Sequence, residues 1–530
     1  MKESQRKKDV VVLFKGNPYK NTKNREKLRV PLIPLSLISL ASPLKEAGYT
    51  IKIVDQSRSV EEHFSDLGDI WQRVICVGLS ALTGSEISEG IDFVSLIKKK
   101  DPTIPVVWGG WHVSILPEQS IKHRCVDIIV KGLGQKTFLD LVKCIDSGRS
   151  LDSVKNLYYK DGNKTVFTGI DCDLKLEDYP LLAFGMLDLE DYRKNSLFLR
   201  LKEVIRDLEI TGHLYYVSSF GCPNDCAYCC SRAVFGRKIY KYNIEKVVEQ
   251  IKWLVNEKKF NSISFMDANF FIDIHRVKTL CELLVKEKIK FVWDAQMHVK
   301  DIIRYEKKGL WKLMTKSGCW RVNIGSESGS QEILDYIRKH IKIDEIFQSA
   351  QILSKYKVEA AYNFLFALPL VEDKKHIYES FKLAEKLKRI NPEFSLPISF
   401  YVPFPGTTMY NDALSRGLKP PDSLEEWGQF DTNYDVASEV YPWKFLKREK
   451  LIMDVLTFYI PLAIPGNMYR GTIRQINDKM QNSKIKSFIK MAHCLAKLGV
   501  KYSFYHIPFE IMIFKLYRFL KGSPAYLPGG

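Results

Sequence analysis

The chain has 530 residues, which is too long for one ordinary hydrophobic core, so about two to four domains are expected. Its 80 basic and 62 acidic residues leave a net charge of +18, which favours anionic ligands such as phosphate-bearing cofactors, acidic membrane surfaces or nucleic acid. A charged N-terminus and the lack of about 18 uninterrupted apolar residues argue against a secretory signal and a membrane-spanning helix.

Short apolar runs alternate with helical patterns through residues 9–150. This alternation predicts an α/β domain with a doubly wound, Rossmann-like parallel sheet, whose ligands bind beyond the carboxyl ends of the strands. The predicted strands are Val10–Phe14, Ile51–Val54, Val74–Leu79, Pro105–Trp108 and Val126–Val130. Glycine-rich loops follow three of them, and glycines let the backbone approach a large ligand closely.

A connector over residues 151–208 precedes a second alternating unit, residues 209–420. Six strand-helix units predict a partial (β/α)6 barrel with strands at Leu214–Ser218, Ser262–Met266, Phe291–Trp293, Arg321–Ile324, Ala361–Phe366 and Ile398–Val402. Residues 421–530 lack strand alternation and are predicted to form a mostly helical C-terminal region.

The most informative motif is a group of three closely spaced cysteines, Cys222, Cys226 and Cys229. Soft thiolates select iron-sulfur clusters or zinc. A structural zinc site commonly uses two separated cysteine pairs, and no second pair is found. The spacing therefore favours a 4Fe-4S cluster with three ligated irons and one open iron. Cys230 is interpreted as a spare or supporting thiol, and the alternative is a group of structural thiols on a tight turn.

The octapeptide Cys222-Pro223-Asn224-Asp225-Cys226-Ala227-Tyr228-Cys229 resembles the signature of the radical S-adenosylmethionine (SAM) superfamily. The resemblance implies that SAM binds the open iron and is cleaved reductively to a 5′-deoxyadenosyl radical, and that a donor such as flavodoxin or ferredoxin supplies electrons. Tyr228 occupies the aromatic position that lies near the adenine in that family.

Two later segments resemble SAM-binding segments of the same superfamily. Met266-Asp267-Ala268-Asn269 matches an acidic segment beside the SAM amino group, and Gly325-Ser326-Glu327-Ser328 matches one in which the glutamate binds SAM hydroxyls or its amino group. The resemblance thus implies Asp267, Asn269, Glu327 and Ser328 as SAM contacts. Helix capping or a solvated turn is the alternative for both acids. Phe366-Ala367-Leu368-Pro369 departs from the family's Gly-x-Pro turn.

Tyr401–Thr407 and residues 30–145 resemble the cobalamin-binding subgroup of the superfamily. That resemblance implies an N-terminal cobalamin-binding domain. The Asp-x-His-x-x-Gly element of classical cobalamin proteins is absent, so His112 is not predicted as a cobalt ligand, and a structural role for it is the alternative. Gln135 stands where relatives often carry glutamate. The residues implied as cobalamin contacts are Ser80, Thr83, Gly84, Gly109, Gly110, His112, Gly132 and Gly134.

Most of the 11 cysteines are isolated in apolar surroundings, which favours free thiols and a cytoplasmic location. Tyr502–Leu520 mixes aromatic and basic residues. It could bind a membrane surface peripherally, or cover the core or a substrate pocket. The basic surface and this stretch slightly favour a hydrophobic, lipid-like or anionic small-molecule substrate.

The resemblance implies a cobalamin-dependent radical SAM methyltransferase, in which a 5′-deoxyadenosyl radical activates an unactivated carbon that then takes a methyl group from methylcobalamin. A radical cyclase or rearrangement enzyme without net methyl transfer is the alternative within the family. A non-catalytic metal-binding module for nucleic acid would need an aromatic-basic groove motif, which is not found, so no nucleic-acid partner is expected. A transfer RNA methylthiolating enzyme usually has further cluster cysteines in its N-terminal domain.

Overall fold

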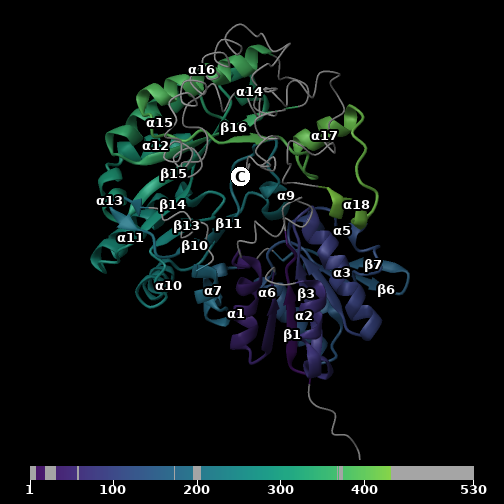
Figure 1. Cartoon of the computed structure of the whole chain (residues 1–530). Helices are drawn as coiled ribbons and strands as arrows, with labels where there is room; N and C mark the ends of the chain where they lie inside the picture. The colour runs from purple at the N-terminus through teal and green to yellow at the C-terminus, as the bar shows by residue number, and fades with distance from the viewer. Residues whose placement is uncertain are drawn as a thin grey trace, which may run out of the picture.

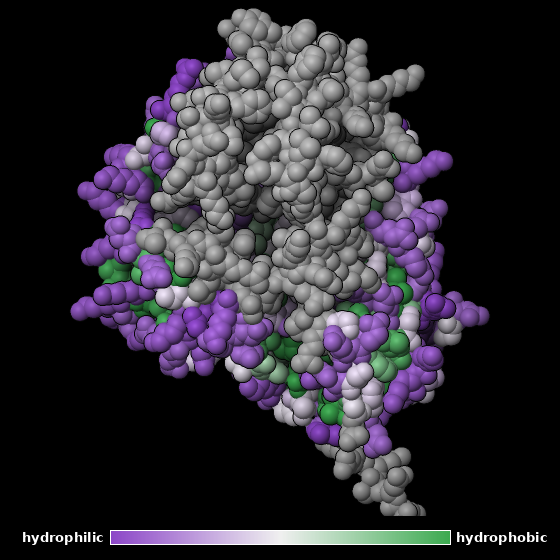
Figure 2. Space-filling view, in the orientation of Figure 1, coloured by the Kyte–Doolittle hydropathy of each residue, from purple (hydrophilic) through white to green (hydrophobic). Residues whose placement is uncertain are grey.

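The computed structural model describes residues 8–17, 32–55, 59–171, 174–194, 204–366, 368 and 374–430. The predicted helical region beyond residue 430, with its Tyr502–Leu520 stretch, lies outside these residues, as do Ala367 and Pro369. Among the described helices, none is long and apolar enough to cross a membrane. On the face seen in Figure 2, the described periphery is largely hydrophilic, with smaller apolar areas.

The N-terminal unit is built on a seven-stranded sheet in the order β2-β1-β3-β4-β5-β6-β7 (Figure 1). Its parallel part confirms the predicted doubly wound sheet and consists of β1 (Val10–Phe14), β2 (Thr50–Val54), β3 (Val74–Ser80), β4 (Val106–Gly109) and β5 (Ile128–Val130).

Helices cover both faces of this sheet because its strands are apolar on both sides. Val11 and Leu13 of β1 pack with α1 (Leu35–Glu46) and α6 (Gly134–Asp146), whereas alternate residues of β1 pack with α2 (Val60–Ser65) and α3 (Ser85–Lys100). Alternate side chains of a strand point to opposite faces, so burial on both sides requires a near-continuous apolar run.

Packing of the N-terminal unit continues past the boundary predicted at residue 150. The antiparallel strands β6 (Leu157–Asp161) and β7 (Lys164–Phe167) extend the sheet within the predicted connector. Helix α18 (Leu424–Gln429) also returns to this unit: the carbonyl of Trp427 accepts a 3.2 Å hydrogen bond from the Gly84 N–H. Residues on both sides of the predicted domain boundaries therefore pack together.

The second unit is a curved, six-stranded parallel sheet in the order β10-β13-β14-β15-β16-β17. These strands confirm the predicted partial barrel. They span β10 (His213–Tyr216), β13 (Ser262–Phe265), β14 (Val292–Met297), β15 (Cys319–Glu327), β16 (Glu359–Phe366) and β17 (Ile398–Phe400). The surrounding helices include α10 (Ile244–Asn256), α11 (Ile274–Lys286), α12 (Val299–Lys307), α13 (Trp311–Lys316), α14 (Gln331–Tyr336), α15 (Ile343–Lys355) and α16 (Lys374–Ile390).

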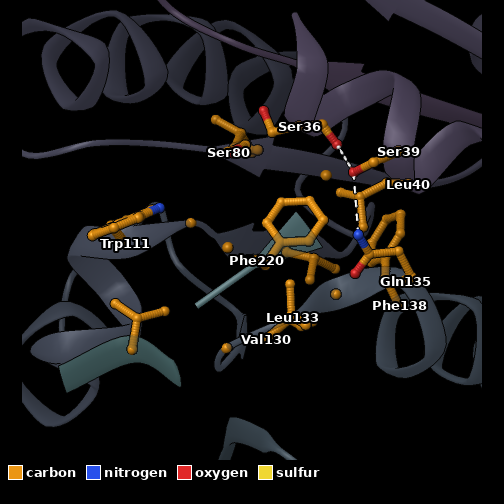
Figure 3. Close-up of a pocket in the computed structure, with 18 of the residues that line it drawn as sticks. Ser36, Ser39, Leu40, Ser80, Trp111, Val130, Leu133, Gln135, Phe138 and Phe220 are labelled. Atoms are coloured by element: carbon orange, nitrogen blue, oxygen red, sulfur yellow. Dashed lines mark hydrogen bonds between the residues drawn. The ribbon is translucent and has the colours of Figure 1, made fainter. Parts of the chain in front are cut away.

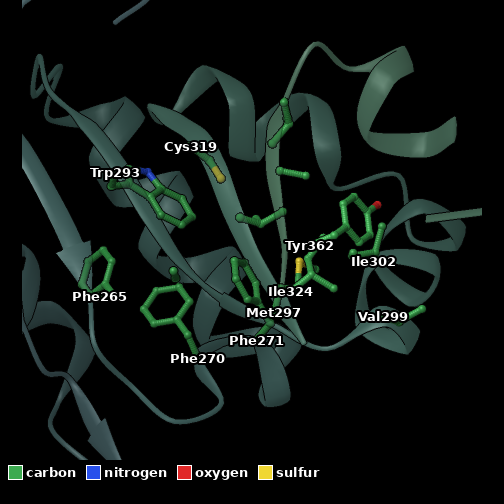
Figure 4. Close-up of a cluster of buried hydrophobic side chains, with 14 of the residues drawn as sticks. Phe265, Phe270, Phe271, Trp293, Met297, Val299, Ile302, Cys319, Ile324 and Tyr362 are labelled. Atoms are coloured by element: carbon green, nitrogen blue, oxygen red, sulfur yellow. The ribbon is translucent and has the colours of Figure 1, made fainter. Parts of the chain in front are cut away.

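The two faces of this sheet differ in polarity. Phe265, Trp293 and Ile324 belong to the buried apolar cluster beneath the helices (Figure 4). Neighbouring residues of the same strands face the other way and are polar: the Asn323 amide donates a 2.8 Å hydrogen bond to Asp294. The apolar face holds the helices in place, and the polar face lines the inside of the partial barrel.

Candidate active site

The cysteine loop follows β11 (Ser219–Phe220) and begins with a glycine that the geometry requires. Gly221 has a φ of +88°, and a Cβ there would lie 2.1 Å from the carbonyl oxygen of Lys238. A side chain would clash and strain the backbone. The loop closes with a 3.1 Å hydrogen bond from the Cys229 N–H to the Cys226 carbonyl and leads into α9 (Ser231–Phe235).

Three contacts from the barrel hold this loop. The Ala227 N–H donates to the Ile337 carbonyl at 2.9 Å, and the Ala227 carbonyl accepts from the Met409 N–H at 3.0 Å. At the rim, Asp225 pairs with His340 at 2.8 Å, and this contact lowers the pKa of Asp225. The segment after α14 and the start of α17 (Thr408–Ser415) thus fix the loop from two sides.

The three loop cysteines differ in burial. Cys222 and Cys226 are half-buried and Cys229 is exposed. No group of three or more His, Cys, Asp or Glu side chains within the described ranges is arranged to hold one ion. A 4Fe-4S cube makes no such demand, because each thiolate binds a different iron. Burial raises the pKa of Cys226 to about 11, and the Lys339 charge acts in the opposite direction.

Asp267 lies directly beneath the loop, fully buried, and supports the strand that leads into it. Its carboxylate accepts hydrogen bonds from the Ser218 N–H at 2.9 Å, the Ser218 hydroxyl at 2.7 Å and the Ser219 hydroxyl at 2.5 Å. Burial raises the pKa of Asp267, while Arg276 and the serine donors counteract this shift. Both carboxylate oxygens are therefore committed to the chain itself.

Arg276 completes this support from the other side. Its guanidinium donates to the Ser218 hydroxyl at 3.2 Å, to the Ser218 carbonyl at 3.1 Å and to the Tyr242 carbonyl at 3.3 Å. Ser218 thus bridges a buried acid and a buried base. Ser218 donates two hydrogen bonds to Asp267 and accepts two from Arg276, four in all. The backbone four residues before Cys222 is therefore held firmly.

On the far side of the loop, Tyr228, Glu327 and Lys339 form a buried polar triad. The Tyr228 hydroxyl and the Lys339 ammonium each donate a 2.8 Å hydrogen bond to the same oxygen of Glu327, and Lys339 also contacts the Tyr228 hydroxyl at 3.2 Å. Burial and the Glu327 charge raise the pKa of Tyr228. For Lys339, burial lowers the pKa, but Glu327 and the nearby thiols outweigh it. A buried cation beside a carboxylate and a phenol suits a zwitterionic ligand.

The backbone around Glu327 is shaped for this arrangement. Glu327 has a φ of +60°, and the register of β15 against β16 shifts between Gly325 and Glu327. A Cβ at Gly325 would lie 2.1 Å from a Glu327 carboxylate oxygen and 2.4 Å from the Lys339 ammonium. Left-handed backbone at a residue other than glycine is uncommon and concentrates at functional sites.

Two further residues expected at the SAM site lie in different surroundings. Asn269 is buried beside the loop, with its amide nitrogen 3.7 Å from the Cys222 sulfur and its amide oxygen without a partner. Ser328 is turned toward α16, where its hydroxyl lies 3.1 Å from that of Ser380. The structure therefore brings Tyr228, Asn269 and Glu327 to the cysteine loop and directs Ser328 away from it.

A pocket opens at the carboxyl ends of the N-terminal strands, where α/β sheets bind ligands (Figure 3). Five of the predicted cobalamin contacts line it: Ser80, Gly109, Gly110, Gly132 and Gly134. The second unit supplies the facing wall with Phe220, Val234 and Phe235. Phe220 lies two residues before Cys222, so the pocket and the cysteine loop share a wall.

Two adjacent glycines of this pocket serve different purposes. A Cβ at Gly110, which has a φ of +95°, would lie 2.6 Å from the Ala81 carbonyl, so the fold requires glycine there. At Gly109 the nearest atoms to an added Cβ would be 3.7 Å away, which is ordinary contact. The absence of a side chain at Gly109 therefore leaves room in the pocket rather than relieving a clash.

The remaining cobalamin candidates lie outside the pocket. Thr83 and His112 contact each other at 3.0 Å, and the buried His112 ring packs against Trp427. Burial lowers the pKa of His112 to about 3. Gly84 donates its N–H to Trp427, as described above. These three residues hold helix α18 against the N-terminal unit.

Two family models match separate parts of the chain. The B12 binding domain model matches residues 23–142, and the Radical SAM superfamily model matches residues 216–384. An uncharacterised methyltransferase of Pyrococcus horikoshii is 26% identical over 73% of this chain and 79% of its own. An anaerobic magnesium-protoporphyrin IX monomethyl ester cyclase of Rubrivivax gelatinosus is 27% identical over 82% and 80%.

A solved structure shares the fold of this chain. The cobalamin-dependent SAM radical enzyme OxsB, solved with aqua-cobalamin and SAM bound, aligns with a TM-score of 0.67 at 17% identity, over 98% of this chain and 76% of that one. The order of the two domains agrees with the family-model matches. The chain is therefore a cobalamin-binding radical SAM enzyme, with an N-terminal B12-binding domain followed by a radical SAM domain.

Proposed function

We propose that this enzyme transfers a methyl group from SAM to an unactivated carbon of a small-molecule substrate. The observation that carries the proposal is the shared wall: Phe220 lines the pocket of the B12-binding domain and lies two residues before the first cluster cysteine. A substrate carbon must be reached both by a radical formed at the cluster and by the methyl carrier, so the two sites have to face each other closely.

At the SAM site, the cysteines would bind the cluster and the buried triad would bind the charged groups of SAM. Cys222, Cys226 and Cys229 would hold the 4Fe-4S cluster. Lys339 offers a positive charge for the SAM carboxylate, and Glu327 offers a negative one for its ammonium or hydroxyl groups. When bound, the cluster and cobalamin supply reductive cleavage of SAM and methyl carriage, respectively.

The neighbouring residues orient these groups. Tyr228 holds Glu327 by its hydroxyl, and Asn269 has an unpartnered amide oxygen for a ligand beside Cys222. We assign Asp267 to support of the cysteine loop, because its oxygens are taken by Ser218 and Ser219. We assign Ser80, Gly109, Gly110, Gly132 and Gly134 to cobalamin binding, and Thr83, Gly84 and His112 to docking of α18.

The reaction requires an electron-donor protein, and the free cysteines favour a cytoplasmic location. Reductive cleavage of SAM needs an external one-electron donor, for which a flavodoxin or ferredoxin is suitable. The cysteines of the described ranges are free, Cys76, Cys281 and Cys319 among the buried ones, which fits a cytoplasmic enzyme.

A radical cyclase is the second candidate, favoured by the similarity to the Rubrivivax gelatinosus cyclase. The two reactions differ in their coproducts. Methyl transfer consumes one SAM as methyl donor, giving S-adenosylhomocysteine, and a second as radical source, giving 5′-deoxyadenosine. A cyclase yields 5′-deoxyadenosine without matching S-adenosylhomocysteine.

The test uses anaerobically reconstituted enzyme, a low-potential reductant, SAM with a trideuterated methyl group, and a small-molecule extract of the cells that make the protein. Methyl transfer predicts a deuterium-labelled product together with equal amounts of both coproducts. None of these should form with Cys226→Ala. Turnover of an extract component that yields 5′-deoxyadenosine alone would contradict methyl transfer and support the cyclase.

A further inference from the structure

Two short segments with exposed basic residues contact the cysteine loop at different points. Residues 236–238 follow α9, and the Lys238 carbonyl oxygen lies so close to Gly221 that a Cβ there would be 2.1 Å from it. Residues 337–340 follow α14, and the Ile337 carbonyl accepts the 2.9 Å hydrogen bond from Ala227. The exposed basic residues of the two segments, which we call the basic rim, are Arg237, Lys238, Arg338 and His340.

Asp225, which lies between Cys222 and Cys226, joins the two segments. One of its carboxylate oxygens is 2.8 Å from the His340 ring, and the other is 3.5 Å from the Arg237 guanidinium. The side chains of His340 and Arg237 are 61% and 60% exposed, so both reach solvent directly beside the loop. A protein bound to the basic rim would therefore lie against the loop that carries the cluster ligands.

The second segment has an unusual backbone that separates its charges. Arg338 and His340 have φ values of +52° and +55°, and their side chains are exposed. Lys339 between them is buried and pairs with Glu327 at 2.8 Å. Left-handed backbone at residues other than glycine is uncommon and concentrates at functional sites. The turn therefore divides one basic run between the buried triad and the surface.

A surface of this kind suits an acidic protein that carries single electrons. Cations around a redox site attract such a carrier and steer its approach, and electron-transfer complexes are typically small and weak. Single-stranded nucleic acid is also anionic, but it is usually bound by aromatic stacking as well. Residues 236–238 and 338–340 include no Phe, Tyr or Trp. The basic rim therefore favours the electron carrier.

We propose that the basic rim docks an acidic one-electron carrier with its redox group against the cysteine loop. The inference rests on the proposed function, because reductive cleavage of SAM requires such a carrier. In the docked complex the carrier is oxidised by one electron, and that electron reduces the 4Fe-4S cluster that Cys222, Cys226 and Cys229 would hold. Charge complementarity acts mainly on the rate of association and makes binding depend on salt.

The test measures binding of flavodoxin, an acidic flavin carrier, to the anaerobically reconstituted enzyme without SAM or substrate. Calorimetry gives the dissociation constant at ionic strengths of about 0.01 M and about 0.15 M, between which the screening length falls from about 30 Å to about 8 Å. The wild type should bind at least tenfold more weakly at the higher ionic strength. The double variant Arg237→Gln, Arg338→Glu should bind at least tenfold more weakly than the wild type at low ionic strength and lose most of the salt dependence.

The matched control is the double variant Lys99→Gln, Lys100→Glu, which changes the net charge equally. Both lysines are exposed at the end of α3, which leads to the start of β4 and thus lies at the sheet edge remote from the pocket. This control should bind flavodoxin like the wild type. In the rim variant, reduction of the cluster by reduced flavodoxin should slow, whereas its reduction by dithionite, its iron content and its SAM affinity should stay unchanged.

Arg338→Ala provides a milder variant if the double variant does not retain its iron, and it should weaken flavodoxin binding about threefold. Equal affinity of the rim variants and the wild type, or an equal loss in the α3 control, would overturn the inference and leave the proposed function intact. No binding of flavodoxin or of a ferredoxin to the wild type would also overturn it, while the coproduct test with a chemical reductant still decides the proposed function. A single-stranded oligonucleotide that binds as tightly as flavodoxin, and is lost in the rim variants, would assign the basic rim to nucleic acid instead.

Discussion

Removal of the Asp267 carboxylate tests whether this residue supports the cysteine loop or binds SAM. In the structure it accepts three hydrogen bonds, from the Ser218 N–H and the Ser218 and Ser219 hydroxyls. Asp267→Ala leaves these donors unpaired and leaves Arg276 without its neighbouring charge. Removal of one partner from a buried charged pair typically costs about 3–5 kcal/mol. We expect the free energy of unfolding to fall by about that amount.

The assay is anaerobic urea unfolding of cluster-free protein, followed by tryptophan fluorescence, with iron content and the SAM dissociation constant measured after reconstitution. Asp267→Ala should unfold at lower urea and retain less iron, while molecules that keep the cluster bind SAM normally. Ser219→Ala is the matched control, because it removes one hydrogen bond and should cost about 1 kcal/mol. Unchanged unfolding and full iron, with SAM binding weakened tenfold or more, would refute this reasoning and restore Asp267 as a SAM ligand.

Three further predictions concern the pocket, the triad and α18. Gly109→Val should leave the unfolding transition near that of the wild type but weaken corrinoid binding at least tenfold by filling the pocket, and equal affinity in a titration would contradict this. Lys339→Met should raise the SAM dissociation constant at least tenfold without loss of iron, as calorimetry can check, whereas loss of iron with normal SAM affinity would indicate a structural role only. His123 pairs with Glu425 of α18 at 2.8 Å. Contact with Cys125 raises the pKa of His123, burial lowers it, and Glu425 raises it, with a net upward shift. Its stabilisation of α18 should thus be complete below about pH 6.5 and be lost as pH rises through the folded-state pKa. After correction for the intrinsic rise of the exchange rate with pH, the hydrogen-exchange protection of residues 424–429 should fall over that range in the wild type and not in Glu425→Gln. Equal pH profiles of protection in the two proteins would contradict the role of this pair.

The strands were predictable because each is a short apolar run between polar segments. Val10–Phe14, for example, coincides with β1. The hairpin of β6 and β7 was missed because it is an edge structure: Leu157–Asp161 and Lys164–Phe167 carry many polar residues, as exposed edge strands do, and resemble a charged connector.

The candidate site was predictable only where a compact motif carries it. The cysteine loop and the Glu327 segment are local patterns, and the structure brings Tyr228 and Glu327 together. Lys339 was missed because it lies between Arg338 and His340, a basic run that normally indicates solvated surface. Its burial depends on docking of the cysteine loop, more than 100 residues earlier in the chain.

Some residues that the local sequence pattern assigned to the cobalamin site instead contact distant parts of the chain. His112 and Thr83 stand beside a glycine-rich loop, yet they contact each other, and the His112 ring packs against Trp427, more than 300 residues later. Nothing in the local sequence indicates that α18 returns to this loop. The share of the pocket wall supplied by the radical SAM domain was likewise not visible from the B12-binding segment alone.

The measurement that tests the central claim most directly is iron and cobalt content per chain after anaerobic purification from cells supplied with cobalamin, comparing the wild type with Cys226→Ala. Two cofactors held by separate domains predict about four irons and one cobalt in the wild type, with iron lost and cobalt kept in the variant. Iron without cobalt, or cobalt lost together with iron, would contradict a separate corrinoid site facing the cluster.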